Sequence, residues 1–185
     1  MTMINKLERE FKKKGGILRT SMLNELGFSS RQINKLMSEG IISRIKHGFY
    51  ELTDYIPKEE VVIARLFPEA VIFLESASLY YGYTDRIPSA WQIAVDKNSQ
   101  KTKYDLDYPL INPYYLEPKF VDIGVNMIEM DGVKVRIYNR DRTICDVLRY
   151  ENKLEKEVFN NAITRFAAAL ESVLSRGIHS KAFYK

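Results

Sequence analysis

Basic and amide side chains recur at helical spacing between residues 29 and 38. Ile33, Leu36 and Met37 follow the i, i+3, i+4 pattern of one buried helix face. The opposite face then presents Ser30, Arg31, Asn34 and Lys35. These residue types hydrogen-bond to base edges and phosphates. The pattern therefore indicates contact with a nucleic acid.

A second basic set follows in residues 41–53. The extended segments IISRIK and FYELT flank His47-Gly48, and a two-residue turn containing Gly between two such runs predicts a hairpin. Arg44 and Lys46 are two residues apart, which predicts that both lie on one face of their strand. With His47, they are expected to contact the phosphate backbone beside the groove that the helix enters.

Two helices must position this surface. Ser29 and Gln32 have the spacing of a capping box, so the basic helix begins at Ser29 or Ser30, where its N-terminus can also hold a phosphate. Before it, Thr20 or Ser21 is expected to cap a shorter helix. Two helices followed by a hairpin predict a winged helix-turn-helix.

A helix over residues 3–12 completes the predicted domain, which covers residues 1–56. This segment contains ten Lys or Arg and six Asp or Glu, a difference equal to the net charge of +4 of the whole chain. The basic character therefore belongs to this segment, as nucleic-acid binding requires. The alternative is that these residues only solvate the surface. The candidate DNA-binding residues are Arg19, Ser29, Ser30, Arg31, Asn34, Lys35, Arg44, Lys46 and His47.

The composition excludes several classes of protein. The chain has 185 residues, of which 45% are hydrophobic and 28% charged. It has no long apolar run and no apolar signal segment, so we expect a soluble, cytoplasmic protein without a membrane partner. Cys145 is the single cysteine, and the two histidines, His47 and His179, have no cysteine cluster near them. We expect no metal and no cofactor.

Residues 57–185 are predicted to form a larger mixed α+β domain, with Pro57 marking the connector. Its 129 residues are enough for a core of its own. Helices are expected at 59–67, 75–81, 142–150 and from 154 past 166, and strands at 70–74 and 91–95. Residues 97–108 read as a loop or surface hairpin, and 109–118 as an edge strand or irregular run. Asp131-Gly132 predicts a further hairpin.

Two sets of side chains in this domain could contact a partner. Charged residues surround a helix start at 140–149, where the structural interpretation makes Asp141 the cap and pairs Asp146 with an arginine. The alternative is a docking surface. Tyrosines between residues 80 and 115 are the better docking candidates, because tyrosine is enriched in interfaces. The candidate partner-binding residues are Tyr81, Tyr83, Arg142 and Arg149.

Residues 57–185 also contain side chains that could serve an enzyme. Glu75, Asp85, Asp96 and Lys97 could suggest a metal-dependent nuclease. Adjacent residues on a strand point to opposite faces, however, so Asp96 and Lys97 cannot address one metal-bound water. The serines nearby have no histidine partner, and there is no glycine-rich phosphate loop. We expect no catalytic residues.

Three segments resemble the AbiEi-type antitoxins of type IV, or abortive-infection, toxin-antitoxin systems. They are IISRIKHGFYEL, LESASLYYGYTDRIPSAWQIAV and VRIYNRDRTICDVLRY, in the order and at the spacing of that family. The resemblance covers about residues 5 to 165. The text after Arg165 departs from the family pattern, and residues 167–171 resemble a cloning scar, so we expect a truncated or foreign end.

The resemblance implies a bifunctional protein. Its N-terminal domain would bind double-stranded DNA at repeats in its own promoter. It would bind there as a homo-oligomer and repress the operon. Its C-terminal domain would counter a toxin that resembles a nucleotidyltransferase, in defence against phage. The alternative is a plain transcriptional regulator whose second domain senses a ligand or forms a dimer.

Overall fold

The computed structural model describes residues 3–177, which divide into two compact units. Unit 1 contains the described residues up to Ala70, together with Gln100–Ile111 and Met127–Arg136. Unit 2 contains Val71–Ser99, Asn112–Asn126 and the described residues from Ile137 onward. The predicted domain boundary at residue 56 stays a prediction. Unit 1 extends past this boundary, because it also contains later segments of the chain.

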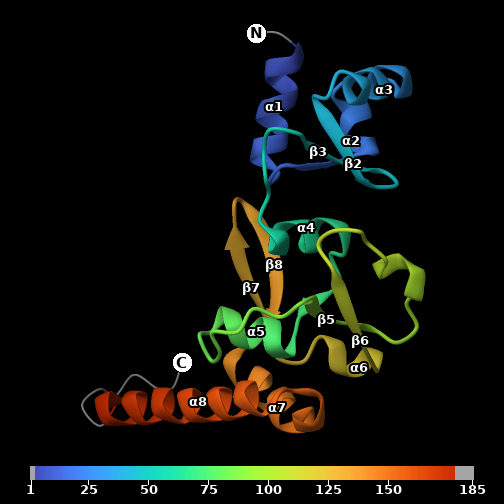
Figure 1. The fold of residues 1–185 in the computed structure, drawn as a ribbon. Helices are drawn as coiled ribbons and strands as arrows, with labels where there is room; N and C mark the ends of the chain where they lie inside the picture. The colour runs from blue at the N-terminus through green and yellow to red at the C-terminus, as the bar shows by residue number, and fades with distance from the viewer. Residues whose placement is uncertain (1–2, 178–185) are drawn as a thin grey trace. The chain divides into compact units, whose positions relative to one another are not determined.

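Unit 1 begins with three helices and a three-stranded antiparallel sheet of order β1-β3-β2 (Figure 1). The elements are α1 (Met3–Lys13), β1 (Ile17–Arg19), α2 (Thr20–Glu25), α3 (Ser30–Ser38), β2 (Ile42–Lys46) and β3 (Phe49–Leu52). One apolar residue set from all three helices meets the sheet. The core contains Leu7, Phe11, Leu18, Leu23, Phe28, Ile33, Leu36, Ile42, Tyr50 and Leu52. This arrangement confirms the winged helix-turn-helix.

The local signals for the two helix starts had different outcomes. The capping box of α3 is confirmed, because the Ser29 N–H donates to Gln32 Oε1 at 2.8 Å and the Gln32 N–H donates to Ser29 Oγ at 3.4 Å. The prediction that Thr20 or Ser21 caps α2 is wrong. Arg19 holds the cap position without a side-chain bond, and the Thr20 N–H donates to the Gly48 carbonyl of the wing turn at 2.9 Å.

Unit 1 is completed by α4 (Glu59–Leu66), the 3₁₀ turn η1 (Lys101–Tyr104) and the tip of a hairpin. The segment 97–108 is a loop that contains one 3₁₀ turn, as one of the two predicted alternatives had it, and not a hairpin. Tyr104 is buried, and its ring centroid lies 5.1 Å from that of Phe67. This aromatic contact ties the polar segment to the end of α4.

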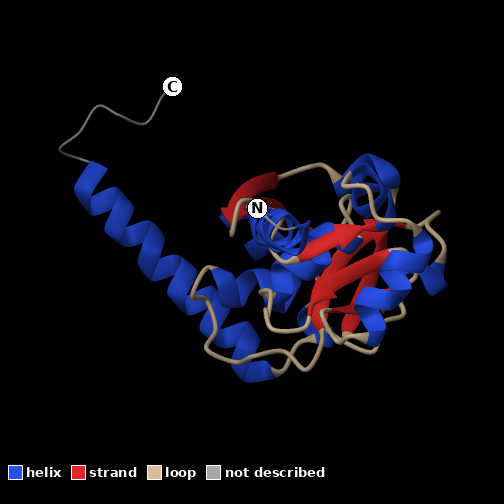
Figure 2. Ribbon diagram, turned by 90° about the horizontal axis from the view of Figure 1, so that it is seen from above, coloured by secondary structure: helices blue, strands red, loops and turns tan. Residues whose placement is uncertain are grey.

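A second sheet has five strands in the order β6-β5-β4-β8-β7. The elements after α4, apart from η1, are β4 (Val71–Ile72), α5 (Leu74–Tyr80), β5 (Trp91–Asp96), β6 (Ile111–Leu116), α6 (Pro118–Val121), β7 (Val125–Met130), β8 (Val133–Tyr138), α7 (Arg140–Arg149), η2 (Glu151–Lys153) and α8 (Lys156–Gly177). β4 is antiparallel to β5 and parallel to β8. The proline-rich segment forms the edge strand β6, and Asp131-Gly132 joins β7 to β8, as predicted. Helices and strands mix along the whole described chain, which confirms the α+β class (Figure 2).

Aromatic rings fill the core of unit 2. Phe73 is fully buried, and the rings of Tyr114, Tyr138 and Tyr150 have centroids 4.9, 5.8 and 5.4 Å from its own. Tilted and edge-on pairs of this kind stabilise a core beyond their buried area. α8 continues the chain as one helix through the segment after Arg165, and His179 lies outside the described residues.

The prediction that Asp141 caps α7 is wrong. The helix begins two residues earlier than predicted, at Arg140, and Asn139 is its cap, accepting a hydrogen bond from the Arg142 N–H at 2.8 Å. Asp141 stands in the first turn, where its negative charge still favours the helix dipole. Asn and Asp cap equally well, so the sequence alone did not separate the two positions.

Gly15→Ala should destabilise the chain by about 1 to 3 kcal/mol beyond Gly40→Ala. Both glycines have positive φ, +72° and +69°, so the backbone strain of alanine is shared. A Cβ at Gly15 would lie 2.6 Å from Val61 Cγ1 and 2.9 Å from Val133 Cγ2, whereas one at Gly40 meets nothing within 4 Å. Urea unfolding of both variants measures the difference. Equal losses would mean that the contacts around Gly15 yield without cost.

Candidate nucleic-acid interface

The outer face of α3 presents the predicted polar set. Ile33 and Leu36 are 2% and 6% exposed, so the helix can rotate little about its axis. Arg31, Asn34 and Lys35 are consequently exposed. Nine residues of helix with a capped N-terminus and an uncovered polar face match the dimensions of an element that enters a major groove.

A groove of about 300 Å³ separates α3 from the wing. Its lining residues are Thr20, Ser30, Ile33, Asn34, Arg44, His47, Gly48 and Tyr50. The structure thus brings together four of the predicted residues, two from the helix and two from the wing. The Arg44 guanidinium carbon lies 5.6 Å from the centroid of the Tyr50 ring, a cation–π contact that helps to position the arginine. Thr20 and Tyr50 are not among the predicted DNA-binding residues.

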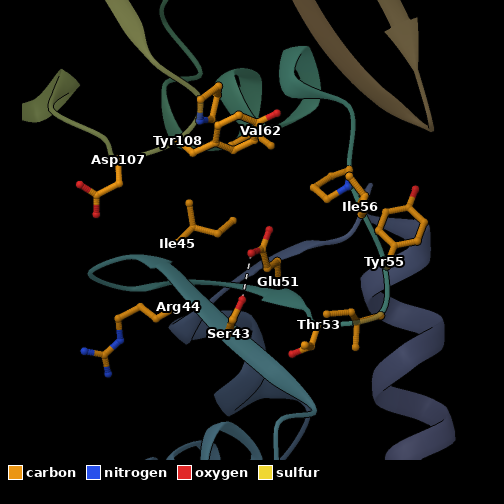
Figure 3. Close-up of a pocket in the computed structure, with 13 residues that line it drawn as sticks. Ser43, Arg44, Ile45, Glu51, Thr53, Tyr55, Ile56, Val62, Asp107 and Tyr108 are labelled. Carbon is orange, nitrogen blue, oxygen red and sulfur yellow. Dashed lines mark hydrogen bonds between the residues drawn. The ribbon is translucent and has the colours of Figure 1, made fainter.

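The wing strand β2 is irregular between Arg44 and Lys46. Arg44 pairs with Tyr50 and Lys46 with Phe49, so the register shifts and Ile45 is bulged. The prediction that Arg44 and Lys46 lie on one face of the strand is therefore wrong. Figure 3 shows Arg44 directed away from the cavity into which Ile45 points. Arg44 therefore remains exposed beside α3.

Lys46 is engaged elsewhere within unit 1. Its Nζ donates to the carbonyl oxygens of Lys103 and Asp105, the second at 3.3 Å, and lies 5.5 Å from the centroid of the Phe67 ring. Burial lowers the pKa of this ammonium, and the nearby Asp105 carboxylate opposes that shift. Both carbonyls lie more than fifty residues along the chain, so periodicity could not reveal them.

The remaining predicted residues stand around the groove. Arg31 and Ser29 are exposed, and Lys35 forms an exposed 3.6 Å pair with Glu39, which contributes little stability. Arg19 lies at the end of β1, with its guanidinium carbon 5.0 Å from the Phe49 ring centroid. Within residues 3–177, neither Arg31 nor Arg44 contacts a carboxylate. Their charges are available to an anionic ligand.

The opposite side of the wing forms a cavity with apolar and acidic lining residues. A cavity of about 430 Å³ lies between β2, β3 and the segment after them (Figure 3). Ile45, Val62 and Tyr108 supply apolar surface, and Glu51 accepts a hydrogen bond from Ser43 Oγ at 2.9 Å. Asp107 adds a second carboxylate to the lining. The cavity lining thus carries two carboxylates as well as Arg44, whereas the groove beside α3 has no carboxylate among its lining residues.

The predicted partner-binding residues of unit 2 fall into two groups. Arg142 is largely buried: its Nε donates to Asp146 Oδ2 at 2.8 Å, and its Nη1 donates to the Ile123 carbonyl at 2.9 Å. The pairing of Asp146 with Arg142 is thus confirmed. Burial raises the pKa of Asp146, and the Arg142 charge opposes that rise. These contacts give Arg142 a structural role.

The other three candidates differ in exposure. Tyr83 is 2% exposed, whereas Tyr81 is half-buried and donates its hydroxyl to the Tyr138 carbonyl at 2.8 Å. Arg140 stacks over both tyrosine rings, at 5.1 and 6.0 Å. Arg149 is exposed. Arg149 and the outer edge of Tyr81 are therefore the parts of this set that a partner could reach.

The acids considered for catalysis are held in separate interactions. Asp85 pairs with Arg165, Lys97 Nζ lies 2.5 Å from Glu117 Oε1, and the Asn98 N–H donates to Asp96 at 2.7 Å. Nowhere in the described chain do three His, Cys, Asp or Glu side chains gather as metal ligands would.

Residues 5–53 match the model of a family described as "Transcriptional regulator, AbiEi antitoxin". The match begins in α1 and ends just after β3, so it coincides with the winged helix-turn-helix. The resemblance found in the sequence is thereby confirmed over these residues, and the family is one of regulators rather than enzymes. No curated protein shows a significant match to the chain. Of the helices in residues 3–177, none has the length and apolar content needed to cross a membrane.

Arg44→Ala should lower the salt dependence of DNA binding by about one in the slope of log K against log salt, because one phosphate contact is lost. Lys46→Ala should lower it less, since that ammonium already donates to two carbonyls. Titration of a labelled duplex with each full-length variant between 50 and 300 mM KCl, roughly the range where such slopes are measured, provides the comparison. An equal decrease of the slope in both variants would show that Lys46 also contacts a phosphate.

Proposed function

We propose that this protein is a DNA-binding autorepressor and antitoxin. α3 would lie in the major groove, which Arg31, Asn34 and Lys35 would enter, and the wing would follow the backbone. The groove that joins Asn34 to Arg44 carries this proposal, because it places a base-reading amide beside an uncompensated guanidinium. The match of residues 5–53 to a family of transcriptional regulators supports it.

The remaining residues have positioning roles in this proposal. Ser29 and Ser30 would hold a phosphate at the N-terminus of α3, where free N–H groups and the helix dipole attract anions. Arg44 and His47 would contact the backbone along the wing, and Lys46 would orient the wing through its two carbonyl contacts. The target is proposed to be repeats in the protein's own promoter, occupied by a homo-oligomer in the cytoplasm.

Asn34→Ala should relax sequence preference, at a cost of about 1 to 3 kcal/mol per lost base contact, while the salt slope stays unchanged. Competition between promoter duplex and scrambled duplex measures the preference directly. Lys35→Ala is the matched control on the same exposed face, and should change the slope more than the preference if it contacts phosphate. Preference that survives both Asn34→Ala and Arg31→Ala would show that another face reads the bases.

We further propose that the chain counters a nucleotidyltransferase-like toxin encoded beside it. The antitoxin description of the matched family supports this, as does the separate aromatic core of unit 2. Arg149 and Tyr81 are proposed for partner contact because both are accessible and because arginine and tyrosine dominate the energetics of protein interfaces.

A plain regulator with a ligand-sensing site is the second candidate, and one observation favours it. The cavity behind the wing, at about 430 Å³, falls within the range of small-molecule sites, and its lining combines apolar surface with charged and hydroxyl groups. A ligand there would contact β2 and β3 directly and could bias the position of the wing.

Growth rescue separates the two functions. The neighbouring gene is induced in a host together with the wild-type chain or the Arg31→Ala/Asn34→Ala variant, and survival is compared. Full-length variants are needed, because a cut at residue 56 would separate segments 100–111 and 127–136 from the rest of unit 1, to which they belong. We expect both chains to rescue growth and only the wild type to repress a promoter fusion. A harmless neighbouring gene, or death despite the wild-type chain, would favour the plain regulator.

A further inference from the structure

Arg65 lies in the last turn of α4, beyond the segment that matches the regulator family. Its Nε donates to the Lys14 carbonyl at 2.9 Å, which leaves the outer nitrogens of the guanidinium unused by this bond. The Arg19 guanidinium donates in turn to the Arg65 carbonyl at 3.4 Å. Both arginines line a small cavity of about 100 Å³, together with apolar residues. These are Ile17, Met22, Phe49, Ala64 and Pro68.

The two arginines lack a counter-charge. Neither contacts a carboxylate within residues 3–177, whereas Arg86, Arg142 and Arg165 of unit 2 all do. Burial lowers the pKa of Arg65, and the charge of Arg19 lowers it further. Two like charges held beside one cavity repel each other, and an anion between them would replace that repulsion with attraction.

The pair is continuous with the proposed DNA interface. Arg19 stacks on Phe49, the first residue after the wing turn, and Thr20, the next residue, lines the groove beside Arg44. The Thr20 N–H also donates to the Gly48 carbonyl at the tip of the wing. A duplex in contact with the wing would therefore pass beside Arg19.

We propose that Arg19 and Arg65 form a phosphate-binding site at the flank of the wing. Guanidinium groups bind phosphate through paired N–H donors in a plane, and two of them can hold one phosphoryl group from two sides. A backbone phosphate of bound DNA is the source that continuity with the wing favours, and this part rests on the proposed function. A free phosphate would use the same chemistry.

Salt titration with DNA tests the first source. Arg19→Ala and Arg65→Ala in the full-length chain should each lower the slope of log K against log salt by about one, and promoter and scrambled duplexes should be weakened alike. Arg165→Ala removes the same charge where Asp85 compensates it, and should leave the slope unchanged. Arg65→Lys keeps the charge without the planar fork and should recover part of the slope.

Inorganic phosphate tests the site without DNA. Phosphate at 10 to 50 mM, about the range where weak anion sites fill, should raise the Tm of the wild type above that in chloride of equal ionic strength. The rise should be smaller in Arg19→Ala, which keeps the N-terminus of α3 but lacks one of the two guanidinium groups. Arg19 is exposed and makes few contacts, so this variant keeps the test valid if Arg65→Ala fails to fold.

The outcomes are separable. A lower slope assigns the site to DNA, and phosphate stabilisation with an unchanged slope assigns it to a free phosphate. If the wild type binds no DNA, the proposed function fails, while the phosphate measurement still decides the site. An unchanged slope together with no phosphate effect would overturn the proposal.

Discussion

Burial of Ile33 and Leu36 determines what α3 offers to a ligand. These side chains share one core with Ile42 and Tyr50 of the wing sheet, so the rotation of the helix and the position of the wing are set by the same contacts. The polar face of α3 and the Arg44 side chain are therefore presented together. Loosening of this core would alter the geometry of the groove as well as the stability of the fold.

Charge is distributed differently in the two units. In unit 2 the arginines close local networks, as Arg142 does with Asp146 and the carbonyls before α7. In unit 1, Arg44 and Arg65 have no carboxylate partner among the described residues. Net charge alone does not distinguish these situations. The difference indicates that Arg142 serves the fold, whereas the charges of Arg44 and Arg65 are not balanced by a carboxylate.

Sequence reasoning succeeded where the determining residues are close along the chain. Ser29 with Gln32, the His47-Gly48 turn and the Asp131-Gly132 turn each act within a few residues, and all were predicted. It failed where distant segments decide. The register shift after Arg44 follows no local signal, and Lys46 finds its partners 57 and 59 residues away. The contact of Arg19 with Arg65 spans 46 residues and was missed for the same reason.

The composition of unit 1 from three stretches of chain has a consequence for how the protein is made. α1 to β3 contain their own hairpin and helices, and these contacts of short sequence separation form fast. The segments 100–111 and 127–136 join the same unit only after the intervening strands have been synthesised. The winged helix can therefore take shape on the ribosome well before Lys46 meets the carbonyls that hold it, and the wing acquires its final support late in synthesis.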